Sequence, residues 1–90
     1  MLEDWILRKK EVEASKSKLR GIDLSNAKLM GAKLGGADLT QADLSSAYLI
    51  KADLSKASLV EADLTQAVLS EANLSDADLE GAELMDSYLH

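Results

Sequence analysis

Residues 37–66 of this chain read ADLTQ ADLSS AYLIK ADLSK ASLVE ADLTQ, and this stretch decides the fold. Leucine stands at every fifth residue, and the same spacing runs without a miss from Leu19 to Leu89, giving fifteen leucines. Alanine stands two residues before twelve of them, from Ala27 to Ala82. An internal repeat this short and strict indicates an architecture in which one small unit is stacked many times.

A spacing of five residues fits neither a helix nor a flat strand. Five steps along an α-helix turn the chain by about 500°, so the leucines would spiral around the helix without a common face. Side chains of a strand alternate at every second residue, so leucines five apart would switch sides each time. The leucines can share one interior only if the chain turns a corner every five residues. Stacked coils then supply the contacts that a single coil lacks.

The repeat unit resembles the motif of the pentapeptide-repeat family, which is a small residue, Asp or Asn, Leu or Phe, and two polar positions. The resemblance covers residues 17–90 in uninterrupted register. It implies a right-handed quadrilateral parallel β-helix with four pentapeptides per coil, in which leucine and alanine point inward and the other three positions point outward. Clear matches are residues 37–41, 42–46, 52–56, 62–66 and 72–76.

A second period, of twenty residues, supports four pentapeptides per coil independently of the family motif. Dividing the 74 residues of 17–90 by 20 gives 3.7, so we expect an all-β solenoid of about 3.5–4 coils, spaced by about 4.8 Å. Aligned at twenty, the outward residues are acidic on one face and partly apolar on another, which we expect to lie opposite it. The acidic face is Asp23, Asp43, Asp63 and Glu83, and the apolar face is Met30, Tyr48, Ile50, Val68 and Tyr88.

Each of these two faces is a candidate protein contact. Exposed apolar side chains often mark interfaces, and a regular ladder of carboxylates suits a basic protein surface. The alternatives are structural: acidic residues that are solvated and relieved by nearby lysines, and β-forming side chains that favour stacking between coils. A cation held between rungs is a weaker interpretation, because no ring of oxygen ligands is implied.

Residues 1–16 lie outside the repeat, and we expect them to form a helix that caps the solenoid of residues 17–90. Acidic residues come early in this segment and basic residues late, an order that suits the helix dipole. An open coil with exposed leucines needs such a cover. A helix that binds a membrane surface or a partner is the alternative, although its apolar side is small for membrane anchoring. The cap residues are Leu2, Trp5, Ile6 and Val12.

The repeat runs to the last residue of the sequence, so we expect the final coil to have no comparable cover. An open edge of this kind invites pairing. Two copies would then join end to end as a homodimer through residues 75–90. Alternatively, the end frays in a monomer, or the chain is a fragment or works beside a second chain that continues the solenoid. The candidate contact residues are Leu79, Leu84, Met85 and Leu89.

Composition argues against catalysis. The sequence has no cysteine, and its one histidine is His90 at the terminus, where a general base would be poorly held. Many serines follow a leucine in an outward slot, where they suit corners better than nucleophilic chemistry. We therefore expect no enzyme activity, no catalytic residue, no cofactor and no metal site.

Sequence patterns also bear on compartment and partners. The N-terminal segment lacks a signal-peptide pattern, and no apolar stretch is long enough to span a membrane, so we expect a cytoplasmic protein without a membrane partner. A formal net charge of −6 argues against binding nucleic acid, whose phosphates would be repelled.

These features predict a non-enzymatic interaction or scaffold module, a rigid rod whose faces bind an unidentified protein partner. Some pentapeptide-repeat proteins resemble duplex DNA in shape and charge, bind type II topoisomerases and protect them from quinolones. The net charge of −6 fits that alternative, whereas Lys28, Lys33, Lys51 and Lys56 interrupt the negative field. A third hypothesis is a purely structural solenoid that assembles end to end.

Overall fold

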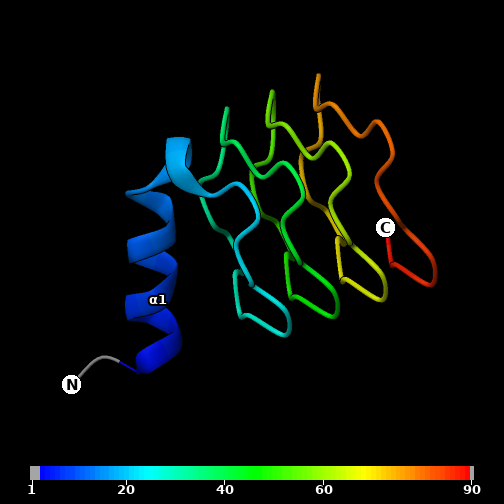
Figure 1. The fold of residues 1–90 in the computed structure, drawn as a ribbon. Helices are drawn as coiled ribbons and strands as arrows, with labels where there is room; N and C mark the ends of the chain where they lie inside the picture. Colours follow the sequence, from blue (N-terminus) through cyan, green and yellow to red (C-terminus); the bar gives the residue numbers. More distant parts are fainter. Residues whose placement is uncertain (1–2, 90) are drawn as a thin grey trace.

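The computed structural model describes residues 3–89 as a short rod with extents of 38 × 25 × 21 Å. The helix α1 (Asp4–Glu13) comes first, the 3-10 helix η1 (Lys16–Lys18) follows, and the rest of the chain winds into stacked coils. Figure 1 shows the coils side by side, with α1 lying across one end of the stack. The predicted cap residue Leu2 and the terminal His90 lie outside the described residues.

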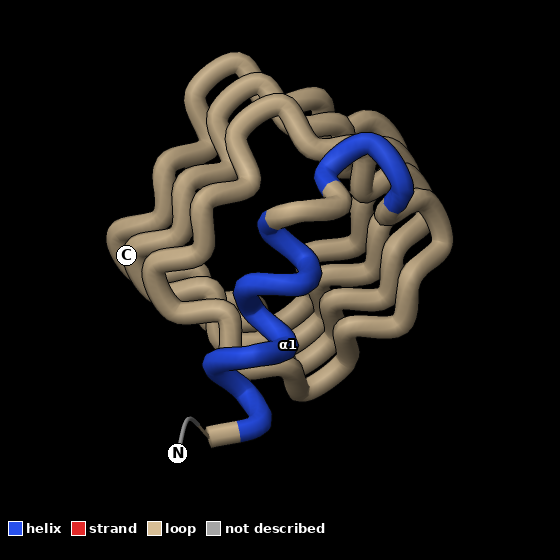
Figure 2. Tube along the Cα trace, turned by 90° about the vertical axis from the view of Figure 1, so that its left-hand side faces the viewer, coloured by secondary structure: helices blue, strands red, loops and turns tan. Residues whose placement is uncertain are grey.

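Each rung of the rod pairs with the rung twenty residues later. Asp23 forms a parallel bridge with Asp43, Asp43 with Asp63, and Asp63 with Glu83, and the other three faces are bridged at the same offset. Around each bridge, one amide donates to the neighbouring coil and one carbonyl accepts from it, as when Leu24 N–H donates to Asp43 O at 2.7 Å. The twenty-residue coil expected from the sequence is therefore the unit of stacking. Figure 2, which looks down the rod from the α1 end, shows the outline of the coils.

The β-structure is more broken than an all-β description suggests. Between residues 3 and 89, each side of a coil contributes a single bridged residue, and no side is long enough to form a continuous strand. The reason is the corner every five residues, which leaves room for one residue of ladder pairing before the chain turns again.

The corners are tight turns with a shared geometry. The leucine carbonyl accepts the N–H of the residue three positions on, as between Leu49 O and Ala52 N at 3.0 Å. The third residue of the turn has a positive φ, such as 62° at Lys51 and 69° at Gly31, which is typical of type II turns. Ten of these corner residues are not glycine. Such residues disfavour the left-handed region, and at seven of the ten the backbone N–H donates to a carbonyl of the next coil, as from Lys51 to Ser70 O at 2.9 Å.

The interior is a column of leucine and alanine. Every repeat leucine from Leu19 to Leu69 has at most 1% of its surface exposed. Beyond that point cover is lost: Leu74, Leu79 and Leu84 are half-buried, and Leu89 is 55% exposed. The column is therefore closed at the α1 end and open at the other.

The acidic face and the apolar face adjoin, which corrects the expectation that they lie opposite each other. Asp23 and Lys28 are consecutive rungs of one coil, separated by the single turn that the Leu24–Ala27 hydrogen bond closes. With four corners in twenty residues, faces five residues apart share a corner, and only faces ten residues apart are opposite. The side opposite the acidic face carries Lys33, Asp53 and Asn73.

Candidate interaction surfaces

Helix α1 supplies polar partners to the first coil, which has no coil before it. Arg8 Nη2 donates to Asp23 O at 3.3 Å, and Lys9 Nζ donates to Met30 O at 3.1 Å. In the other direction, Lys33 N–H donates to a carboxylate oxygen of Glu13 at 2.8 Å. Because unpaired backbone groups at a sheet edge attract other chains, these side chains protect the edge as well as covering it.

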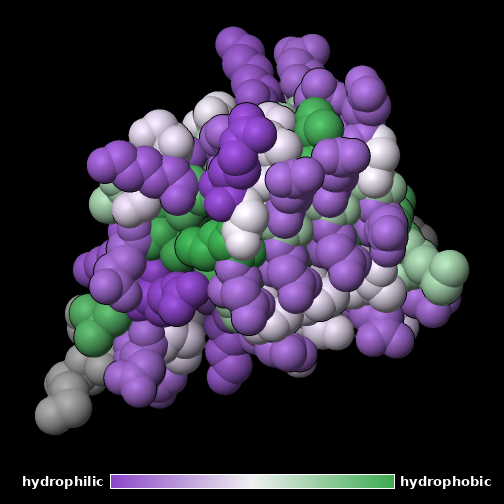
Figure 3. All heavy atoms as spheres, viewed as in Figure 1, coloured by the Kyte–Doolittle hydropathy of each residue, from purple (hydrophilic) through white to green (hydrophobic). Residues whose placement is uncertain are grey.

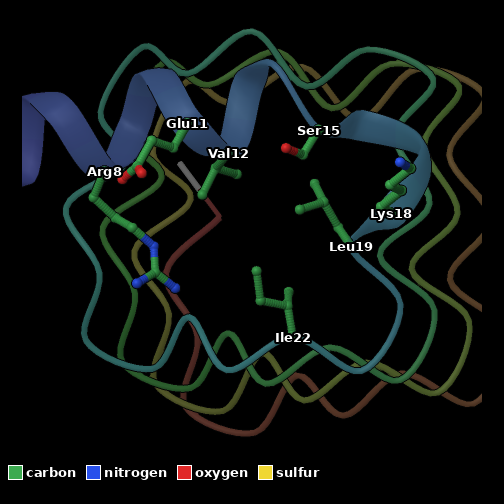
Figure 4. A pocket seen from close by; sticks show the side chains of 7 residues that line it. All are labelled: Arg8, Glu11, Val12, Ser15, Lys18, Leu19 and Ile22. Atoms are coloured by element: carbon green, nitrogen blue, oxygen red, sulfur yellow. The ribbon is translucent and has the colours of Figure 1, made fainter.

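The apolar contact of the cap is narrower than expected. Val12 is 3% exposed and joins the leucine column, whereas Trp5 and Ile6 are half-buried. Below α1 lies an open crevice of about 270 Å³, with Val12, Leu19 and Ile22 inside and charged residues at its rim (Figure 4). The rim carries the positive charges of Arg8 and Lys18 and the negative charge of Glu11, so it favours no single sign of ligand charge.

The three aspartates of the acidic face accept hydrogen bonds within their corners. Asp23 Oδ1 accepts the Ser25 amide at 3.0 Å and the Ser25 hydroxyl at 2.7 Å, and Asp43 accepts the same pair from Ser45 at 3.0 and 2.6 Å. Asp63 Oδ1 accepts the Thr65 amide at 2.9 Å. The pKa of Asp23 is lowered by the side chain and the amide of Ser25, and the pKa of Asp63 by those of Thr65. In both cases the side chain is the larger cause. One oxygen of each of these three aspartates thus serves the fold.

The apolar face meets the cap at a groove. Lys28, Tyr48, Val68 and Tyr88 are stacked by successive bridges, and we call this row the Tyr48 ladder. Beside its first two rungs lies the Trp5 groove, an open, mainly apolar groove of about 260 Å³ lined by Trp5, Lys28, Met30, Tyr48 and Ile50. On the side of the molecule that Figure 3 shows, hydrophobic surface is gathered where α1 meets the coils, and most other side chains are hydrophilic.

The structure brings together residues that the sequence analysis had assigned to separate surfaces. Met30, Tyr48 and Ile50 share the groove, and Trp5, expected to cover the end of the column, forms its cap-side wall. Lys9 lies next to Trp5, with its ammonium 5.9 Å from the indole centroid. Val68 and Tyr88 continue the ladder beyond the groove, and Tyr88 is 63% exposed.

The open end combines apolar and acidic surface. Met85 is 71% exposed, and Leu79 and Leu84 are half-buried beside Leu89. Residues 57–90 contain eight Asp and Glu residues and no Lys or Arg, a formal charge of −8. Residues 1–56 contain ten basic and eight acidic residues, a charge of +2, and the two parts sum to the net −6. Charge is therefore segregated along the rod.

The described residues hold no group of three His, Cys, Asp or Glu side chains that could bind a metal ion. Over the same part of the chain, no helix has the length and hydrophobicity needed to cross a membrane.

Comparison with known proteins agrees with this geometry. No curated protein matches the chain significantly. Among solved structures, it is similar to a pentapeptide repeat protein from the thylakoid lumen of Arabidopsis thaliana, with 39% identity, a TM-score of 0.74, and coverage of 77% of this chain and 48% of that one. It is also similar to the pentapeptide repeat protein Rfr23 of the cyanobacterium Cyanothece 51142, with 33% identity, a TM-score of 0.59, and coverage of 80% and 53%.

The chain thus matches about half of the length of each of these proteins. The family profile for pentapeptide repeats matches residues 11–45 and 47–86, with eight copies. With its leucine column, its five-residue sides and this match over most of its length, the chain belongs to the pentapeptide-repeat family.

Proposed function

We propose that this protein is a non-enzymatic interaction module, a rigid rod that binds a protein partner through its apolar face. The observation that carries the proposal is the Trp5 groove, where side chains from α1 and two coils leave an open apolar surface. Tyr48 on its wall is 43% exposed. Aromatic side chains are enriched in the cores of interfaces, and exposed apolar patches are otherwise costly in a soluble protein.

Rigidity supports this role. Tyr48 N–H donates to Ala27 O at 2.9 Å, Leu49 N–H donates to Val68 O at 2.7 Å, and Leu49 is fully buried below them. The rung that presents Tyr48 is thus fixed to the coils on both sides. A surface that is ordered before binding loses less entropy on association.

Site-specific photo-crosslinking tests the proposal. A photoreactive residue in place of Tyr48 is expected to give a discrete adduct in cell extract, containing either a second copy or another protein. The same residue in place of Asp78, an exposed rung on the opposite face, is the matched control. Adducts of equal yield at both positions, or none at Tyr48, would overturn the proposal.

A second candidate is a DNA-mimicking protein that binds a type II topoisomerase. The run of eight carboxylates without a cation in residues 57–90 favours it, and the lysines of the first coils oppose it. The test is inhibition of supercoiling by the intact chain and by the Asp43→Asn, Asp63→Asn double variant, which removes charge and keeps the corner acceptors. No inhibition by the intact chain at high concentration would end this hypothesis.

A third candidate is end-to-end assembly through Leu79, Leu84, Met85 and Leu89. Two like ends would bring two segments of charge −8 together, so this assembly should strengthen as salt screens the repulsion. Light scattering across a salt series tests it, and association that weakens with salt would contradict it.

Two finer expectations remain proposals. We propose a right-handed winding of about 3.5–4 coils, supported by the twenty-residue bridges and the family membership, and an experimental structure tests it. We also propose a cytoplasmic location, which fractionation tests, although one similar solved protein comes from the thylakoid lumen.

A further inference from the structure

We propose that two copies of this chain pair side by side and antiparallel through the apolar face, with Tyr88 of each copy seated in the Trp5 groove of the other. This inference rests on the proposed function, because it names the occupant of the same face. It is distinct from end-to-end assembly, which would use the open coil and leave the groove empty.

The groove and its proposed occupant lie on one ladder. The Trp5 groove lies beside the rungs of Lys28 and Tyr48, and Tyr88 stands on the last rung, 63% exposed. Three rung spacings, about 14 Å, separate Lys28 from Tyr88 along the rod. A groove of about 260 Å³ has room for one large side chain, and a tyrosine offers an apolar ring with a polar tip.

Charge selects the antiparallel orientation. The first 56 residues carry +2 and the last 34 carry −8, so parallel rods would place acidic end against acidic end. Antiparallel rods place each acidic end against the cap end of the other copy. There Lys28 lines the groove and Lys9 lies beside Trp5. Complementary potentials of this kind fix the register of an interface and speed its formation.

A two-fold axis gives this pairing a specific register. An axis perpendicular to the rods, midway between the rungs of Tyr48 and Val68, places Tyr48 opposite Val68 of the second copy. It places Lys28 opposite Tyr88 of the second copy. Each contact then occurs twice, as in any two-fold interface.

The same axis pairs charges at one edge of the face. Lys51 and Glu71 are successive exposed corner residues directly after the Tyr48 and Val68 rungs, with positive φ values of 62° and 61°. A two-fold axis lying in the interface keeps each edge against the same edge of the other copy. Lys51 therefore faces Glu71 of the second copy, and this ion pair is also made twice. In a parallel dimer the residues at the same levels would be uncharged, because Lys51 would face Ser46 and Glu71 would face Gln66.

The test is sedimentation equilibrium of the purified full chain at concentrations up to about 1 mM, the range that weak interfaces require. We expect a monomer–dimer equilibrium that weakens as salt is added. The Tyr88→Ala variant should lose it. Trp5 is the only tryptophan, so its fluorescence should change with concentration in the intact chain and not in Tyr88→Ala.

Charge reversal tests the register. Lys51→Glu and Glu71→Lys should each weaken dimerisation, by about tenfold, and the double variant should restore it. Lys56→Glu and Glu61→Lys are matched controls, because both stand at corners away from the Tyr48 ladder with φ values of 61° and 58°. Circular dichroism confirms that each variant is folded.

Three results would overturn the proposal: a monomer at about 1 mM in low salt, a dimer insensitive to Tyr88→Ala and to both reversals, or association that strengthens with salt. If the purified chain is monomeric while a crosslinker at Tyr48 captures a different protein, the antiparallel dimer is wrong and the interaction-module function stands. If neither occurs, both are wrong.

Discussion

Asp53 and Asn73 stand one above the other in neighbouring coils, and each accepts the same pair of hydrogen bonds from the serine two positions on. The hydroxyl bond is 2.6 Å and the amide bond is 2.9 Å at both corners. A charged and a neutral side chain therefore close the same turn. The turn geometry requires an oxygen acceptor at the right distance, and a negative charge on that acceptor strengthens the bonds without changing their lengths.

This geometric equivalence predicts that Asp53→Asn lowers thermal stability at neutral pH much less than Asp53→Ala, because the asparagine keeps an acceptor for two donors that the alanine leaves without a partner. The measurement is the melting temperature by circular dichroism. Asn73→Ala should match Asp53→Ala. Equal losses for the Asn and Ala variants at position 53 would mean that charge, not turn geometry, matters there.

Acid should weaken the fold through the corner carboxylates. The hydroxyl and amide of the residue two positions on lower the pKa of Asp23, Asp38, Asp53 and Asp63. A pKa lowered on folding contributes stability above the unfolded value of about 3.9, and this contribution is lost as pH falls through the folded value. The urea midpoint should therefore be nearly flat down to about pH 5 and fall below about pH 4.

The matched control for this pH dependence is a variant with asparagine at all four positions. It keeps the acceptors and removes the titrations, so its stability should depend less on pH in the acid range. A fall as steep as that of the unsubstituted chain would assign acid sensitivity to other groups.

The leucines of the column should contribute unequally to the free energy of unfolding, depending on their place along the rod. Leu54→Ala is expected to cost about 2–5 kcal/mol in unfolding free energy, because Leu54 is fully buried between coils. Leu89→Ala should cost under about 1 kcal/mol, because more than half of Leu89 is exposed. Urea denaturation at low protein concentration measures both. Equal costs would contradict an open end and imply that a partner covers it.

Glycine substitutions should separate backbone strain from crowding. A Cβ at Gly31 meets nothing within 4 Å, but φ there is 69°, so Gly31→Ala should cost about 1 kcal/mol through the left-handed backbone alone. Gly35 lacks a positive φ, and its Cβ would lie 3.4 Å from Ser55 Oγ. Gly35→Ala should be neutral or slightly stabilising. A larger loss at Gly35 than at Gly31 would contradict this assignment.

Amide hydrogen exchange should report the bond between the cap and the first coil. Lys33 N–H is held by the Glu13 carboxylate at 2.8 Å, so its exchange should be slow and should accelerate in Glu13→Ala. Glu13→Gln keeps an acceptor and should give an intermediate rate. The Asp53 amide, which donates to Ala32 O within the stack, is the internal control whose rate should not change.

The interior and the coil could be predicted because strict periods leave little choice. The five-residue leucine spacing anticipated the buried column, and the twenty-residue period anticipated bridges such as Tyr48 to Val68. The buried column and the bridges between coils follow from repetition alone, so both could be predicted from the sequence.

The surfaces were harder to predict because they depend on contacts outside the repeat. The placement of the two faces was wrong, although the spacing of five residues between Asp23 and Lys28 already implied that their faces share a corner. The Asp-Leu-Ser and Asp-Leu-Thr triplets, as at Asp53–Ser55, were a visible signal for the corner bonds. No sequence pattern predicted the groove, because the position of Trp5 depends on how α1 lies across the first coil.

The twenty-residue offset between bridged rungs also constrains how such a chain can change its length. Removing one pentapeptide would rotate every later side chain by a quarter turn, carrying tyrosines onto a neighbouring side and breaking whatever surface they formed. Adding or removing a whole coil would lengthen or shorten the rod and leave each side with its own chemistry. Duplication in whole coils is therefore the route by which a protein of this kind can gain reach without losing its binding specificity.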